Sequence, residues 1–198
     1  MTPLVLASAS RVRLHLLASA GVDVIADAAT VDEDEVKRAL KAEGADTARA
    51  AETLAELKAL RISARRPGSY VLGADQMLVC EGAWFDKPPD LPAACSQLLS
   101  LKGRMHELVC GAVIVRDGVR VWHTVDRARL TMRDFSDAFL EDYLSSVGED
   151  ALRSVGGYQL EGRGAQLFAR VDGDFFTVLG LPLLPVLGYL RQAGLLVA

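Results

Sequence analysis

The chain has 198 residues, of which 51% are hydrophobic and 24% charged. This composition excludes bulk disorder, and a chain of this length can bury a hydrophobic core. Lysine and arginine number 22 against 26 aspartates and glutamates, giving a net charge of -4, so we expect no nucleic-acid partner, which would need a basic surface. The longest uncharged stretch, 175–190, is shorter than the roughly 20 residues of a membrane span and contains prolines, so we expect no membrane partner.

The N-terminal and cysteine patterns favour a cytoplasmic protein. The first basic residues follow the short apolar run 3–7 rather than precede it, so no secretory signal is expected. The three cysteines form no CxxC pair, and we interpret them as buried free thiols in a reducing compartment, with a redox or zinc role as the alternative. The histidines show no metal-ligand spacing, so zinc is not expected.

Hydrophobic periodicity, caps and breaker residues predict strands that alternate with helices along the chain. The expected strands are 4–6, 22–25, 70–74, 77–80, 108–115, 119–125 and 166–171. The expected helices are 11–20, capped by Ser10, then 47–65, 92–101, 137–146 and 182–193. This alternation indicates an α/β fold with a mixed sheet, in one domain over 1–198.

The segment LASASRVR, residues 6–13, is the first candidate site. A strand delivers Ser8 and Ser10 to the start of a helix, and Arg13 follows one turn later. Helix N-termini favour anions, and an arginine adds donors suited to phosphate oxygens. A plain serine cap beside a solvated arginine is the alternative. No Walker motif is present in the sequence.

Two charged residues interrupt apolar patterns. In GADQ, residues 73–76, an apolar strand ends in Asp75, whose carboxylate suits binding of a metal or of a catalytic water. An aspartate that merely starts a turn is an equally good interpretation. Lys58 lies on a helical stripe that otherwise holds Ala51, Ala55 and Ile62, either as a site lysine or as a snorkelling one. Because methionine would extend that apolar stripe, we expect the Lys58→Met variant to fold and to be at least as stable as wild type.

Three further segments carry candidate residues. The acidic run VDEDE offers Glu33 as an oxygen ligand for magnesium, or it is a solvated helix start. The segment DKPPD holds Lys87 before a proline, with a surface loop as the alternative. The glycine-rich loop 156–165 contains one isolated carboxylate, Glu161. No nucleophile elbow occurs, so serine or cysteine nucleophilic catalysis is not expected.

Taken in order, these segments resemble the Maf family of nucleoside triphosphate pyrophosphatases over nearly the whole chain. The segments are LASASRVRLHLL, VDE, LAELKA, LGADQ, DKP, YQLEGRGAQLF and VLGLPLLPV. The resemblance implies an elongated, two-lobed α/β fold with a central cleft, similar to inosine triphosphate pyrophosphatases. It also implies hydrolysis of a nucleoside triphosphate to the monophosphate and pyrophosphate, with Mg²⁺ or Mn²⁺, by a homodimer.

The resemblance assigns catalytic and phosphate-binding roles to single residues. Ser8, with Ser10 nearby, and Arg13 match the phosphate-holding start of the family motif. Glu33 matches the acidic residue near the metal, and Asp75 matches the proton acceptor, which shares the metal. The two site lysines of the family correspond to Lys58 and Lys87.

Positions 12, 76 and 161 match the family's specificity positions. Gln76 and Glu161 resemble the residues of the subgroup that acts on 7-methyl-GTP, whereas the dTTP/UTP subgroup has threonine and glutamine at these two positions. Val12 stands where the family has arginine or tryptophan, and Arg11 stands in place of its usual proline. The alternatives are a dTTP/UTP or broad-specificity pyrophosphatase and a non-catalytic, nucleotide-binding regulator of septum formation.

Overall fold

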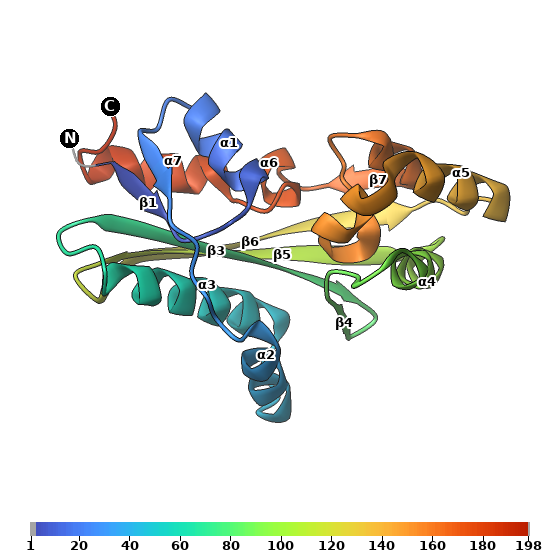
Figure 1. The fold of residues 1–198 in the computed structure, drawn as a ribbon, viewed down its shortest axis with the longest axis horizontal. Helices are drawn as coiled ribbons and strands as arrows, with labels where there is room; N and C mark the ends of the chain where they lie inside the picture. The colour runs from blue at the N-terminus through green and yellow to red at the C-terminus, as the bar shows by residue number, and fades with distance from the viewer. Residues whose placement is uncertain (1–2, 198) are drawn as a thin grey trace. The chain divides into compact units, whose positions relative to one another are not determined.

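A computed structural model describes residues 3–197 of the chain (Figure 1). Its strands are β1 (Leu4–Leu6), β2 (Val24–Ala26), β3 (Tyr70–Cys80), β4 (Ala83–Phe85), β5 (Met105–Arg116), β6 (Val119–Met132) and β7 (Phe168–Asp172). Its α-helices are α1 (Arg11–Ser19), α2 (Glu33–Ala42), α3 (Thr47–Ser63), α4 (Leu91–Leu101), α5 (Asp137–Val147), α6 (Phe175–Val178) and α7 (Leu183–Gln192). Short 3₁₀ helices span Gly148–Arg153, Val155–Gly157 and Arg163–Leu167.

The strands form one seven-stranded sheet in the order β2-β1-β3-β5-β6-β7, with β4 paired to β3. β1 runs parallel to both β2 and β3, and Val5 lies opposite Val71 in the second pair. β4 is antiparallel to β3, and β7 is antiparallel to β6. The sheet is therefore mixed, and the predicted mixed α/β fold is confirmed.

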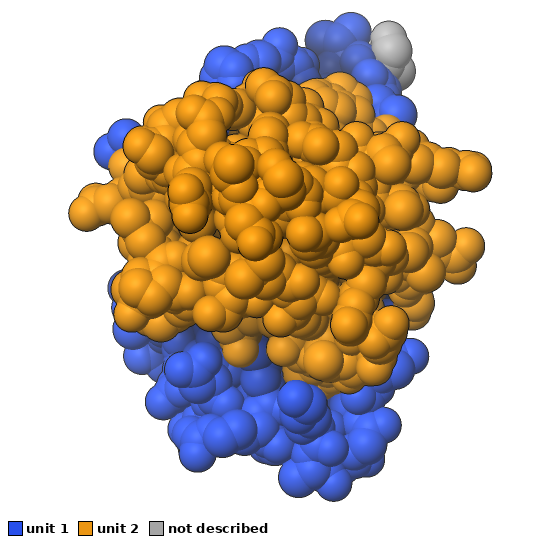
Figure 2. Space-filling view, turned by 90° about the vertical axis from the view of Figure 1, so that its right-hand side faces the viewer, with its two compact units in different colours: residues 1–76, 110–126, 180–198 blue, residues 77–109, 127–179 orange. Residues whose placement is uncertain are grey.

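The chain divides into two compact units, which Figure 2 colours blue and orange. Unit 1 comprises 1–76, 110–126 and 180–198, and unit 2 comprises 77–109 and 127–179. Each has buried apolar side chains of its own, such as Val71 and Val113 in unit 1 and Phe135 and Leu140 in unit 2. The expectation of one two-lobed domain with a central cleft stays a prediction.

Helices cover both faces of the sheet within unit 1. α3 lies along one face, and α1 and α7 lie on the other (Figure 1). The start of α1 is fixed by Ser10, whose Oγ accepts a hydrogen bond from the backbone N–H of Arg13 at 3.3 Å, as the sequence predicts. The sheet thus carries a capped helix start on one face and the long helix α3 on the other.

The predicted break within β3 is wrong. The sequence places Asp75 at the end of a strand, but β3 runs without interruption from Tyr70 to Cys80, so Asp75 lies inside it. An aspartate is depleted in strands because its charge resists burial. Here the carboxylate meets a buried lysine, described below, and that partner makes its place inside the strand tolerable.

Other local expectations hold in part. β5 begins at Met105 and β6 continues to Met132, beyond the expected bounds 108–115 and 119–125, and the helix α2 is absent from the expected helices. The turn at Asp117 and Gly118 joins β5 to β6, and both residues take positive φ values of 50° and 77°, as a two-residue hairpin requires. The strand expected at 166–171 begins at Phe168, because the preceding residues form a 3₁₀ helix. None of the three cysteines is in a disulfide; Cys80 and Cys110 are buried as expected, whereas Cys95 is only partly buried. Within 3–197, no helix combines the length and apolar character needed to cross a membrane.

Candidate active site

A buried lysine between two carboxylates forms the centre of the site in unit 1. Nζ of Lys58, on α3, lies 2.6 Å from Oδ1 of Asp75 on β3 and 2.7 Å from Oε1 of Glu33 at the start of α2. The side chains of Lys58 and Asp75 are only 10% and 7% exposed, whereas that of Glu33 is 41% exposed. The ammonium therefore pairs with the carboxylates instead of snorkelling to solvent.

The second oxygen of Asp75 is buried and, among the described residues, has no hydrogen-bond partner. Leaving a buried carboxylate oxygen unpaired is costly, so it marks a place where a ligand can bind. A metal ion, a water proton or a substrate group would each satisfy it.

The residues present fit a magnesium-type ion. No group of three or more histidine, cysteine, aspartate or glutamate side chains that could hold a metal occurs in residues 3–197. Mg²⁺ does not need such a cluster, because it commonly takes one or two carboxylates and completes its shell with water and substrate phosphates. Glu33 and Asp75 supply that pair, and Oδ2 of Asp75 is the open ligand atom.

The start of α1 brings the serines and the arginine of the first motif together. The guanidinium of Arg13 donates from Nη1 to Oγ of Ser8 at 3.3 Å, and the backbone N–H of Ser10 donates to the same oxygen at 3.2 Å. Nε of Arg13 donates to the backbone carbonyl of Gly180 at 2.7 Å. Ser10 is thus the helix cap, while Arg13 is held in place rather than freely solvated.

A cysteine on the neighbouring strand holds the side chain of Gln76. The carboxamide of Gln76 is hydrogen-bonded to the buried Cys110 on the neighbouring strand β5. Burial raises the pKa of the Cys110 thiol to about 12, against the opposing effects of Arg13 and of the Gln76 bond. The thiol therefore stays protonated at neutral pH. On α1, Val12 is half-buried and Arg11 is exposed.

Lys87 and Glu161 belong to unit 2. Lys87 is exposed in the loop between β4 and α4, directly before the buried Pro88. Glu161 is exposed in the turn before the 3₁₀ helix Arg163–Leu167. In unit 1 the structure brings Lys58 together with Glu33 and Asp75, as the resemblance implies; the roles of these residues and of the unit 2 pair stay predictions.

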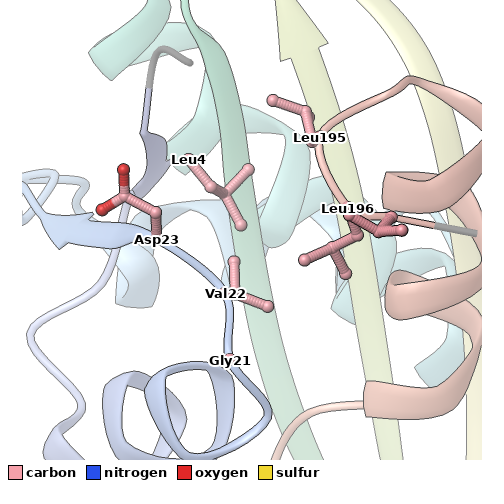
Figure 3. A pocket seen from close by; sticks show the side chains of 7 residues that line it. Leu4, Gly21, Val22, Asp23, Leu195 and Leu196 are labelled. Carbon is pink, nitrogen blue, oxygen red and sulfur yellow. The ribbon is translucent and has the colours of Figure 1, made fainter.

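A separate cavity of about 240 Å³ lies in unit 1 near the chain ends (Figure 3). Its described lining is mostly apolar and includes Leu4, Val22, Leu195 and Leu196, with Asp23 as its one charged side chain. A phosphate would meet no cation there, so this cavity does not suit a nucleotide.

Comparison with known proteins identifies the family. Residues 3–193 match the family model described as Maf-like protein. The chain belongs to the Maf-like protein family. A relative from Paramagnetospirillum magneticum is 55% identical over 97% of this chain and 99% of its own length. One from Granulibacter bethesdensis is 55% identical over 96% of both chains, and one from Rhodospirillum rubrum is 48% identical over 99% and 97%.

All three relatives bear the name nucleoside triphosphate pyrophosphatase. A solved structure of a nucleoside-triphosphatase, named dITP/XTP pyrophosphatase, from Mycobacterium abscessus is similar over 99% of this chain and 98% of its own. Its identity is 15% and its TM-score is 0.48, values too low to establish a shared fold.

Several supporting residues of this Maf-like chain escape sequence reasoning. Gly180 and Cys110 contact Arg13 and Gln76 from distant parts of the chain, and neither has a local signal of that role. In unit 2, His106 is buried and its Nε2 lies 2.7 Å from the hydroxyl of Tyr158, which anchors the start of the loop that carries Glu161. A tyrosine inside a glycine-rich loop is the one signal that could have pointed to such an anchor.

Proposed function

We propose that this Maf-like protein hydrolyses a nucleoside triphosphate between its α and β phosphates, releasing the monophosphate and pyrophosphate. Full-length relatives at 45–55% identity are named nucleoside triphosphate pyrophosphatases, and the chain is an enzyme of that class. The observation that carries the proposal is the buried Lys58 between Glu33 and Asp75, beside a carboxylate oxygen that has no partner in the described residues.

Phosphate binding is the task of the cationic side chains. A nucleoside triphosphate carries about four negative charges, which must be stabilised while water attacks phosphorus. Arg13 is pre-oriented by Ser8 and Gly180, so little side-chain freedom is lost when it binds a phosphate oxygen. A lysine ammonium has three N–H donors; Glu33 and Asp75 take two from Lys58, which leaves one for phosphate. Lys87 would bind the pyrophosphate leaving group.

Proton transfer is the proposed task of Asp75. Its Oδ1 is held by Lys58, which fixes the orientation of the carboxylate and leaves Oδ2 to accept a proton from the attacking water. Glu33 and Asp75 would also hold Mg²⁺ or Mn²⁺, which when bound supplies positive charge to the phosphates and polarises them. No covalent intermediate with the protein is needed.

The substrate base follows from hydrogen-bonding chemistry. A carboxylate accepts hydrogen bonds and donates none, and guanine presents two adjacent donors, whereas uracil and thymine present one donor between two acceptors. Methylation at position 7 adds positive charge, which strengthens a contact with a carboxylate. Glu161, with Gln76 assisting, would therefore select 7-methyl-GTP or a related modified purine over UTP and dTTP.

Exchange of one carboxylate for an amide tests this selection. We expect wild type to give its highest kcat/KM with 7-methyl-GTP among 7-methyl-GTP, GTP, UTP and dTTP. In Glu161→Gln the preference should shift toward the pyrimidines, because an amide can donate as well as accept. A wild-type preference for UTP or dTTP, or an unchanged ranking in the variant, would show that Glu161 does not read the base. The matched control is Glu149→Gln, an exposed carboxylate elsewhere in unit 2.

We further propose that the protein acts as a homodimer in the cytoplasm. Three cysteines outside any disulfide support a reducing compartment, and a net charge of -4 supports a small-molecule substrate rather than nucleic acid. Sedimentation analysis tests the dimer, and a monomeric mass at working concentration would contradict it.

Release of pyrophosphate by purified protein tests the activity itself. Incubation with each nucleotide and Mg²⁺ or Mn²⁺ should yield pyrophosphate, and omission of the metal should reduce the yield. A protein that binds nucleotide but releases none would act as the non-catalytic regulator instead.

A further inference from the structure

Gly73 on β3 lies against the backbone of α3. A Cβ atom at this position would overlap the carbonyl oxygen of Ala55 and would lie 2.9 Å from the backbone nitrogen of Ala59, where ordinary contact begins at 3.4 Å. Gly73 is not among the glycines with positive φ, so its backbone conformation is open to any residue. Glycine is required here for space and not for its conformational freedom.

This close approach lies beside the proposed catalytic pair. Gly73 precedes Asp75 by two residues in the same strand, so both face α3. Lys58 directly precedes Ala59, whose backbone nitrogen a Cβ at position 73 would meet, and follows Ala55 by less than one helical turn. The separation between helix and strand at Gly73 therefore governs how far the ammonium of Lys58 lies from Asp75, now 2.6 Å.

We propose that Gly73 is a positioning residue, which sets the depth at which α3 lies on β3 and so places Lys58 against Asp75. The inference rests on the proposed function of that pair. Both side chains are almost fully buried, so neither can swing through solvent to make up for a displaced helix. A side chain at position 73 would push α3 outward by on the order of 1 Å, a misplacement that can cost about 10²-fold in rate.

A second glycine supplies a matched control. A Cβ atom at Gly111 on β5 would lie 2.6 Å from the carbonyl oxygen of Ala51 and 2.7 Å from the nitrogen of Glu52. This is the same kind of clash with the same helix. Ala51, however, precedes Lys58 by seven residues, roughly 10 Å along the helix axis, so a displacement there is remote from the catalytic pair.

The experiment compares Gly73→Ala with Gly111→Ala in thermal stability and in steady-state pyrophosphate release well below the melting temperature. Both variants should melt earlier than wild type. Only Gly73→Ala should lose about 10²-fold in kcat. Its KM should rise far less, because the proposed phosphate contact of Lys58 is weakened while Arg13 and its partners are untouched. Gly111→Ala should keep a kcat near that of wild type once corrected for the folded fraction.

Ala55→Val, with Ala51→Val as its control, is the alternative pair if Gly73→Ala does not fold, because both alanines are fully buried and the backbone of each meets one of the two glycines. We expect Ala55→Val to lower kcat and Ala51→Val to leave it near wild type. Equal losses of kcat in the two members of a pair, or full activity in Gly73→Ala, would overturn the positioning role. Absence of pyrophosphate release from wild type would instead overturn the proposed function.

Discussion

For the replacement of Lys58 by methionine, the structure predicts a loss of stability where the sequence pattern predicts none. The apolar stripe on α3 alone suggests that methionine would extend it and could add stability. The ammonium, however, lies 2.6 Å from Asp75 and 2.7 Å from Glu33. Removing it leaves the buried charge of Asp75 with no compensating partner among the described side chains, so we expect Lys58→Met to destabilise the protein.

The magnitude follows from burial. Breaking a buried ion pair by removing one partner costs about 3–5 kcal/mol, because the remaining charge stays desolvated. Glu33, at 41% exposed, is solvated without Lys58 and adds little to this cost. We therefore take the lower end, about 3 kcal/mol, which for a chain of this size corresponds to a fall in Tm of roughly 10 °C. A domain stable by about 5–15 kcal/mol stays folded at 25 °C.

Denaturant unfolding at pH 7, with a double-mutant cycle, measures this cost. Lys58→Met/Asp75→Asn removes both charges and should recover part of the stability lost in Lys58→Met. A Lys58→Met protein as stable as wild type at pH 7 would refute the reasoning and restore the snorkelling interpretation.

Three further predictions concern the proposed base Asp75, the backbone anchor of Arg13 at Gly180, and the buried His106 in unit 2. Asp75→Asn should lower kcat by about 10²–10⁴-fold while nucleotide binding by calorimetry is retained; near-normal turnover would refute its role as base. Gly180→Ala should raise KM for the triphosphate, because its φ is +97° and a Cβ would lie 3.4 Å from the guanidinium of Arg13; an unchanged KM would show that this anchor is dispensable. Burial lowers the pKa of His106 from 6.5 to about 4, so the unfolded chain takes up a proton first and stability falls as pH drops through that window. Between pH 6.5 and 4 wild type should lose about 3 kcal/mol more than His106→Gln, and parallel losses would contradict the assignment.

Local signals in the sequence predict much of the fold. The Ser10 cap, the helix from Thr47 and the turn at Asp117 each depend on residues within a few positions of one another, so the structure reproduces them. The uninterrupted course of β3 through Asp75 depends instead on Lys58, 17 residues earlier in the chain. No window of local sequence contains both partners.

The candidate site divides in the same way. Lys58 stands out in the sequence because a charge on an apolar stripe needs an explanation, and the ion pairs supply it. The anchor of Arg13 on Gly180 joins residues 167 positions apart, and the close approach at Gly73 is a matter of spacing between two elements. Contacts of this kind follow from tertiary packing, which no periodicity or motif describes.

Cleavage between the α and β phosphates is tested most directly by ³¹P NMR of the products. Purified protein with Mg²⁺ and a nucleoside triphosphate should produce the monophosphate and pyrophosphate in equal amounts, and Asp75→Asn should produce neither at a comparable rate. Formation of the diphosphate and inorganic phosphate, which places cleavage at the γ phosphate, would contradict the account.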